Sequence, residues 1–150
     1  LDKSPLEIAA TPSSYRISKK DIRVIYSRPQ LKGRAVADLA PAGKVWRTGA
    51  NEAVEITFYN DTNFGGKAVK AGTYSLFTIP GASEWEIILN SNMNQWGAYS
   101  YDKAGDVARV NGKVTKGEDS LEEFSITFTE TDMVIGWGTT RVSVSFSVAK

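Results

Sequence analysis

Strict alternation of apolar and polar side chains near the C-terminus constrains the fold of this chain more than any other feature. Val142, Val144, Phe146 and Val148 are separated from one another by single serines, and Arg141 precedes the first of them. Successive side chains of a β-strand point to opposite faces, so this pattern predicts a strand with one apolar and one polar face.

The same period of two recurs in two segments before this one. Residues 124–129 and 133–137 place aromatic and branched side chains at every second position, and Thr131-Asp132 reads as a turn between them. Together with residues 141–148 they are predicted to form an antiparallel meander.

Shorter alternating segments, separated by glycine and proline, occupy the rest of the chain. Residues 33–39 favour at most one or two helical turns. About eight short strands with little helix indicate an all-β, antiparallel β-sandwich, jelly-roll-like or barrel-like. The further strands are predicted at residues 21–26, 53–58, 72–80 and 85–90, with a weaker candidate at 107–114.

The 150 residues fit a single domain, because a chain of this length buries roughly 70% of its unfolded surface. Residues 1–20 lack periodicity and are predicted to form an extended N-terminal arm, followed by one domain over residues 21–150. No apolar run approaches the ~18 residues of a membrane span.

Composition excludes several functional classes. The chain contains no cysteine and no histidine, which removes disulfides, thiolate metal sites, imidazole ligands and the usual general base. Its 18 basic and 17 acidic side chains nearly balance, so nucleic acid is not an expected partner. No nucleotide or other cofactor motif is present, and neither a cofactor nor a metal is expected.

The segment from Gly43 to Phe58 has the highest density of candidate site residues. Trp46, Arg47, Asn51 and Glu52 stand directly before an apolar-alternating segment. Extending that parity backwards places Glu52 at the inward end of the row, where Arg47 would pair with it. The pair is either a structural salt bridge or the polar floor of a ligand cleft with Trp46 as its wall, and a catalytic role is a third alternative.

Residues 90–102 form a second candidate segment, in which asparagines and a glutamine surround Trp96. Carbohydrate sites use this mixture, because aromatic rings stack on sugar faces and amides bind hydroxyl groups. Alternatively, Trp96 and Tyr99 fold back onto the core.

Two further clusters are weaker. Arg28 and Arg34 lie in a turn-rich segment and could hold an anionic group, or they are solvated surface charges. The oxygen-bearing side chains of residues 60–63 favour a hairpin turn over a calcium site, because Gly65-Gly66 follows them.

Ordered motifs across residues 20–148 resemble the DUF2911 family, a bacterial, Bacteroidetes-type family of undefined function. The motifs are Tyr26-Ser27-Arg28-Pro29, Lys32-Gly33-Arg34, the stretch from Gly43 to Glu52, Ala71 to Leu76 with Ile79-Pro80, and Asn94-Gln95-Trp96-Gly97. The resemblance implies an exported protein of the periplasm or cell envelope and no defined activity. The N-terminal Leu1 fits a removed export signal.

These observations favour recognition of a small polar or saccharide-like ligand without catalysis. The alternatives are a histidine-free, carboxylate-dependent hydrolase that uses Glu52, and a structural or partner-binding module of the envelope. Glu52 and Glu55 lie three apart and point to opposite faces of a regular strand, which weakens the hydrolase hypothesis. The sequence leaves the ligand's identity and the oligomeric state open.

Overall fold

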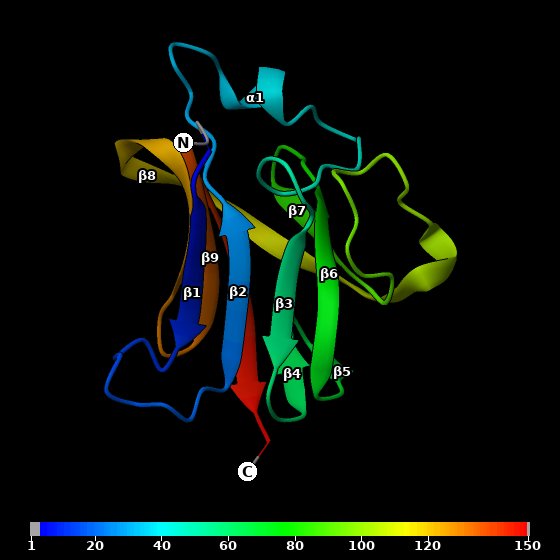
Figure 1. Cartoon of the computed structure of the whole chain (residues 1–150). Coiled ribbons are helices and arrows are strands. Elements are labelled where there is room, and N and C mark those ends of the chain that lie inside the picture. The colour runs from blue at the N-terminus through cyan, green and yellow to red at the C-terminus, as the bar shows by residue number, and fades with distance from the viewer. Residues whose placement is uncertain (1–3, 150) are drawn as a thin grey trace.

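Nine β-strands make up more than half of the described chain, residues 4–149 of the computed structural model, and confirm the predicted all-β class (Figure 1). The only α-helix in this part, α1 (Val36–Leu39), is four residues long, and a single 3-10 turn, η1 (Lys103–Gly105), precedes β8. The strands are β1 (Leu6–Thr11), β2 (Ile22–Ser27), β3 (Val54–Phe58), β4 (Thr62–Phe64), β5 (Lys67–Val69), β6 (Gly72–Ile79), β7 (Glu84–Asn90), β8 (Asp106–Phe128) and β9 (Asp132–Val148).

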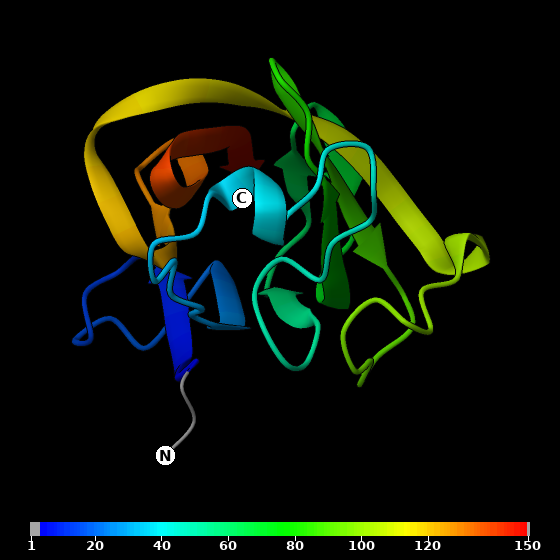
Figure 2. The same ribbon diagram turned by 90° about the horizontal axis from the view of Figure 1, so that it is seen from above.

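All nine strands hydrogen-bond as one antiparallel sheet, in the order β1-β2-β3-β6-β7-β8-β9-β4-β5. The sheet folds over on itself because β8 is long and bent, and seen from above it arches from one side of the molecule to the other (Figure 2). The chain after β2 then meets the second half of β8, where the Phe124 amide donates to the Pro29 carbonyl at 2.9 Å. The opposing layers expected of a sandwich are therefore parts of a single sheet.

The predicted three-strand meander is wrong in one respect. Residues 133–137 and 141–148 belong to the same strand, β9, and the only reversal among these segments is the turn between β8 and β9. Gly136, Gly138 and the two following threonines resemble a turn in the sequence. Gly138 instead adopts a positive φ of 55° and leaves the strand uninterrupted.

A tight hairpin joins β4 and β5, as the predicted turn at Gly65-Gly66 requires. Phe64 pairs with Lys67, so the two glycines form the whole loop, and their φ values are 59° and 89°. Positive φ at both central residues is the signature of the hairpin turn that matches strand twist.

The core fills the inside of the folded sheet and contains an aromatic cluster around Trp46. The Trp46 ring stacks on Trp137 with centroids 5.7 Å apart and meets Trp85 and Phe124 edge-on at 6.0 and 5.3 Å. In Figure 2, α1 lies over the folded sheet, and its Val36 and Leu39 pack against the same core. Aromatic pairs at such distances add stability beyond the area they bury.

Part of the predicted N-terminal arm is an ordered edge strand. β1 lies within residues 1–20 and pairs with β2 in antiparallel register, Leu6 opposite Ser27 and Thr11 opposite Ile22. Ala9 packs against the core from this strand.

Candidate functional site

Two loops that the sequence singled out separately lie against each other. The loop before β3 and the loop between β7 and β8 run antiparallel for a few residues, where Ala53 N donates to Gln95 O at 2.9 Å and Gly97 N donates to Asn51 O at 3.0 Å. Glu52 and Trp96 form an isolated β-bridge between these bonds. We call this contact, residues 47–53 with residues 93–97, the loop junction.

Backbone strain is concentrated at the loop junction. Among residues 4–149, three of the four non-glycine residues with positive φ are Thr48, Asn51 and Asn94, at 62°, 60° and 58°. For a β-branched residue such as Thr48 this conformation is a genuine outlier. Strained backbone of this kind persists only where surrounding contacts hold it, and it clusters at functional sites.

Thr48 shows how the strain is held. Its side chain is fully buried, and its hydroxyl donates to the Trp46 carbonyl at 3.2 Å and lies 3.1 Å from the Thr78 hydroxyl. The Trp46 backbone also bridges to Thr78 in β6, which fixes this loop to the sheet. The loop is therefore rigid where it approaches Trp96.

The two predicted site tryptophans have opposite environments. Trp46 is 6% exposed and belongs to the core, whereas Trp96 is 61% exposed at the loop junction. A large aromatic ring presented to solvent on a fixed loop is a potential stacking surface. Tyr99 is exposed as well, so neither Trp96 nor Tyr99 folds back onto the core.

Arg47 is half-buried and makes no hydrogen bond or ion pair with any residue of the described part of the chain. Its Nε is buried, and its Cδ would lie 3.7 Å from a side chain placed at Gly97, so the arginine stem runs along the second loop. The Oε1 atom of Gln95 in that loop is also buried and unpartnered. Buried polar atoms without partners are rare in folded proteins and call for an explanation.

The inward orientation expected for Glu52 is wrong, and so is its ion pair with Arg47. Glu52 is exposed, and within residues 4–149 no oxygen of Glu52 comes within 4.0 Å of an Arg47 nitrogen. The parity argument fails because β3 begins only at Val54, and Asn51, at a positive φ, turns the backbone before it.

Arg28 and Arg34, the two remaining candidates, are engaged by the protein itself. Arg28 donates to the Phe124 carbonyl at 3.0 Å and to Ser125 Oγ at 2.8 Å, and lies 3.6 Å from both Glu7 and Glu123. It fastens β1 and β2 to the second half of β8. Arg34 donates to backbone carbonyls of its own turn at 2.8 and 2.9 Å. Neither joins the loop junction.

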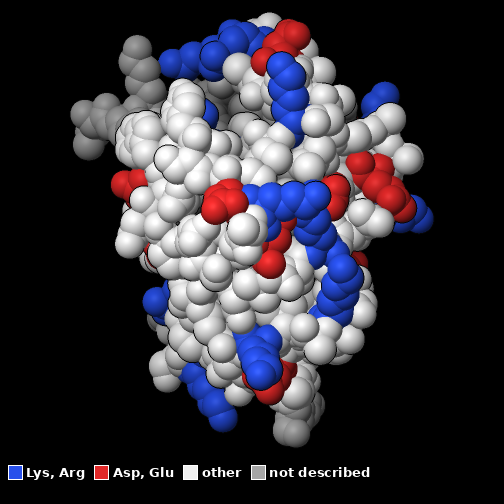
Figure 3. All heavy atoms as spheres, turned by 90° about the vertical axis from the view of Figure 1, so that its right-hand side faces the viewer, with Lys and Arg blue, Asp and Glu red and all other residues white. Residues whose placement is uncertain are grey.

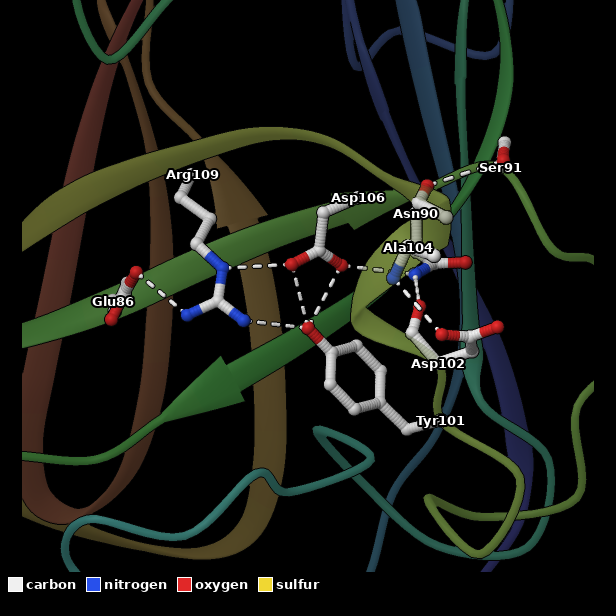
Figure 4. A network of polar contacts seen from close by, with 9 residues as sticks. Glu86, Asn90, Ser91, Tyr101, Asp102, Ala104, Asp106 and Arg109 are labelled. Carbon is white, nitrogen blue, oxygen red and sulfur yellow. Dashed lines mark hydrogen bonds and ion pairs between the residues drawn. The ribbon is translucent and has the colours of Figure 1, made fainter.

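A polar network that the sequence analysis did not identify anchors the loop of Trp96 to the sheet (Figure 4). The Tyr101 hydroxyl lies 2.7 and 2.8 Å from the two carboxylate oxygens of Asp106, and Arg109 donates to that hydroxyl at 2.6 Å. Arg109 also donates to Asp106 at 2.8 Å and to Glu86 at 3.1 Å. Asn90 donates to Asp106 and to the Asp102 carbonyl, each at 2.9 Å.

The network shifts the pKa values of its members in the directions that tighten it. Burial alone raises the pKa of Asp106, but hydrogen bonds from Tyr101, Asn90 and Arg109 outweigh it and lower that pKa. Burial and the bond to Asp106 raise the pKa of Tyr101. Burial lowers the pKa of Arg109, yet its acceptors Asp106, Glu86 and Tyr101 raise it overall. At neutral pH the network holds a carboxylate, a neutral phenol and a guanidinium.

Sequence spacing concealed this network. Asp106 and Arg109 are three residues apart, and on a regular strand they point to opposite faces. A register shift between Leu89 and Asn90 breaks the regular pairing of β7 with β8 and places Asn90 opposite Asp106. The sequence offers no signal for a bulge at this position.

The face that carries the β7–β8 loop shows basic and acidic side chains side by side (Figure 3). Lys and Arg do not gather there into a patch of one sign, which disfavours a polyanion on this face. In the described residues no group of three acidic side chains is placed to hold a metal ion. No helix of residues 4–149 has the length and hydropathy needed to cross a membrane.

Fold and site together define an all-β protein in which two strained loops meet beside an exposed tryptophan. A family model described as "Protein of unknown function (DUF2911)" matches residues 9–146, nearly the whole chain, and the protein belongs to this family. Comparisons with curated proteins and with solved structures found no match.

Proposed function

We propose that the loop junction recognises a small polar or saccharide-like ligand and does not catalyse its conversion. The single observation that carries this proposal is that the two loops of the junction carry an exposed Trp96 ring and an Arg47 guanidinium that has no partner among residues 4–149. One supplies a stacking surface and the other supplies directed hydrogen-bond donors, the two elements that a saccharide site combines.

The remaining groups of the junction fit the same class of ligand. Glu52 is exposed next to Trp96 in the β-bridge, where its carboxylate can accept hydrogen bonds from hydroxyl groups. The Arg47 fork suits a carboxylate or a pair of neighbouring oxygens. A ring that bears hydroxyl groups and one carboxylate would use all three side chains.

Rigidity supports binding at this place. The Tyr101 network and the Thr48 contacts fix both loops, so the ligand does not have to order them. Preorganised sites bind more tightly because little conformational entropy is lost on association.

Binding is tested by thermal-shift screening and calorimetry with neutral sugars, uronic acids and peptidoglycan fragments. Arg47→Ala and Trp96→Ala are expected to lose binding while remaining folded. Tyr15→Ala removes another exposed ring that is not part of the loop junction, and it is expected to bind as the wild type does. A screen without hits, equal binding by all variants, or turnover of a bound probe would contradict the proposal.

The proposed setting is the bacterial periplasm or cell envelope, which rests on the family resemblance. Fractionation of cells that express the complete gene tests it, and recovery of the protein in the cytoplasmic fraction would contradict it.

A further inference from the structure

An open cleft of about 840 Å³ is lined by segments at one end of the folded sheet. In Figure 1 the β1–β2 connection and the end of β9 lie at the end of the molecule opposite α1. Three segments enclose it: the chain between β1 and β2, the turn between β8 and β9, and the end of β9. Ligand sites commonly have volumes of roughly 300–1,000 Å³ and often lie in the mouths of barrel-like sheets. The cleft is separate from the loop junction and shares no lining residue with it.

Backbone and side-chain contacts fix all three walls. In the first, Lys20 Nζ donates to the carbonyls of Pro12 and Ser14, the latter at 2.8 Å, and Asp21 N donates to Thr11 O at 2.8 Å. The other two walls are joined to each other, because the amide of Phe146 donates to the Thr131 carbonyl at 2.9 Å and ties the β8–β9 turn to the end of β9. The cleft is therefore preformed.

The lining combines apolar rings with hydroxyl groups. Phe128 and Phe146 are half-buried in its wall and meet edge-on with centroids 5.9 Å apart. Six of the twelve lining residues carry hydroxyl groups: Thr11, Ser13, Ser14, Thr129, Thr131 and Ser147. An aromatic wall with a hydroxylated rim suits a ligand that has one apolar ring face and several hydroxyl groups.

The charged groups that line the cleft are both acidic. Asp21 accepts a hydrogen bond from Asn60 at 3.3 Å, and Glu130 is exposed and forms no ion pair among residues 4–149. The ammonium group of Lys20 is held by the Pro12 and Ser14 carbonyls of the first wall, and Lys19 and Lys20 line a different pocket together with Arg23. Two carboxylates without a cation in the lining favour an ammonium group and disfavour an anion.

We infer that this cleft is a second binding site, which takes a saccharide unit bearing a free amine. The ring packs on Phe128 and Phe146, its hydroxyl groups meet the rim, and the ammonium group lies between Asp21 and Glu130. This inference does not depend on the function proposed for the loop junction.

Titration of the isotope-labelled full chain with glucosamine, followed by amide NMR, tests the site. Shifts are expected in the amide signals of residues 11, 13 and 14, of residues 128–131 and of residues 146–148. N-acetylglucosamine has no ammonium group and is expected to bind at least several-fold more weakly, and glucuronate is expected not to bind here. Glu130→Gln and Asp21→Asn should each weaken glucosamine binding several-fold.

Two variants serve as controls. Glu84→Gln removes an exposed carboxylate at the start of β7, outside the cleft lining, and should leave glucosamine binding unchanged. Trp96→Ala should also leave it unchanged, which separates the cleft from the loop junction. The inference is overturned if glucosamine shifts no cleft residue or if glucuronate binds equally well. It is also overturned if Glu130→Gln and Asp21→Asn bind glucosamine as tightly as the wild type does.

Discussion

The hydroxyl of Tyr101 lies 2.7 Å from one carboxylate oxygen of Asp106 and 2.8 Å from the other, while its ring meets Phe77 edge-on at 5.0 Å. One side chain thus fastens the β7–β8 loop to the sheet by an apolar contact and by a charge-assisted hydrogen bond. The position of Trp96, a few residues earlier in the same loop, depends on this anchor.

Removing the Tyr101 hydroxyl should loosen the loop. Tyr101→Phe keeps the ring on Phe77 but leaves Asp106 and Arg109 each short of one partner, and we expect a loss of about 1–2 kcal/mol in the free energy of unfolding. Urea denaturation measures it. Tyr99→Phe is the matched control, because Tyr99 is 86% exposed in the same loop and no loss is expected there. Equal stability of the two variants would show that the network anchors nothing.

Acid should weaken the same anchor. The pKa of Asp106 is lowered in the folded protein, so the ionised carboxylate stabilises the fold at every pH above the pKa of the unfolded chain, about 3.9. This contribution disappears as the pH falls through the pKa of the folded protein. Asp106→Asn should therefore be less stable than the wild type at pH 6, and the gap should shrink towards pH 2. Unfolding free energies across this range measure it. A stability difference between Asp106→Asn and the wild type that stays constant or widens in acid would contradict a lowered pKa of Asp106.

Alanine substitution of the two tryptophans predicted as site residues should have very different effects on the free energy of unfolding. Trp46→Ala removes the centre of an aromatic cluster, and a large-to-small substitution of this kind costs about 3–5 kcal/mol. Trp96→Ala removes an exposed ring and should change the stability by less than about 0.5 kcal/mol. Thermal or urea unfolding distinguishes them. A strongly destabilised Trp96→Ala would mean that this ring is part of the core.

The β4–β5 turn offers a matched pair of glycine substitutions. Both glycines have positive φ, so alanine strains either position by about 1–2 kcal/mol. At Gly65 the new Cβ would also lie 2.6 Å from Val110 Cβ, whereas at Gly66 it meets nothing within 4 Å. Gly65→Ala should therefore lower the melting temperature clearly more than Gly66→Ala. The reverse order would exclude this packing of the turn on β8.

Much of the fold could be predicted from the sequence, because alternation in β3 and towards both ends of β9 records which face of these strands is buried. The continuity of β9 through Gly138 could not be predicted, because a glycine at positive φ occurs both in turns and within bent strands. β1 was missed as a strand because its neighbouring residues carry no alternation to extend.

The candidate site, too, could be predicted from the sequence only in part. The two loops were recognisable from their density of tryptophan, amide and charged residues, but their contact is a tertiary event that no local pattern encodes. Glu52 was misplaced because parity holds only within a strand, and β3 begins after it. The Tyr101 network depends on a register shift that follows from how β7 and β8 pack together.

Titration of the four tryptophan indole N–H signals by NMR tests the loop junction most directly. Trp46, Trp85 and Trp137 are buried, and only Trp96 is exposed. With a saccharide or carboxylate ligand from the screen, the Trp96 signal should shift in a saturable way that Arg47→Ala abolishes, while the three buried indoles remain unchanged. A bound ligand that leaves the Trp96 signal in place, or that shifts it equally in Arg47→Ala, would contradict recognition at this junction.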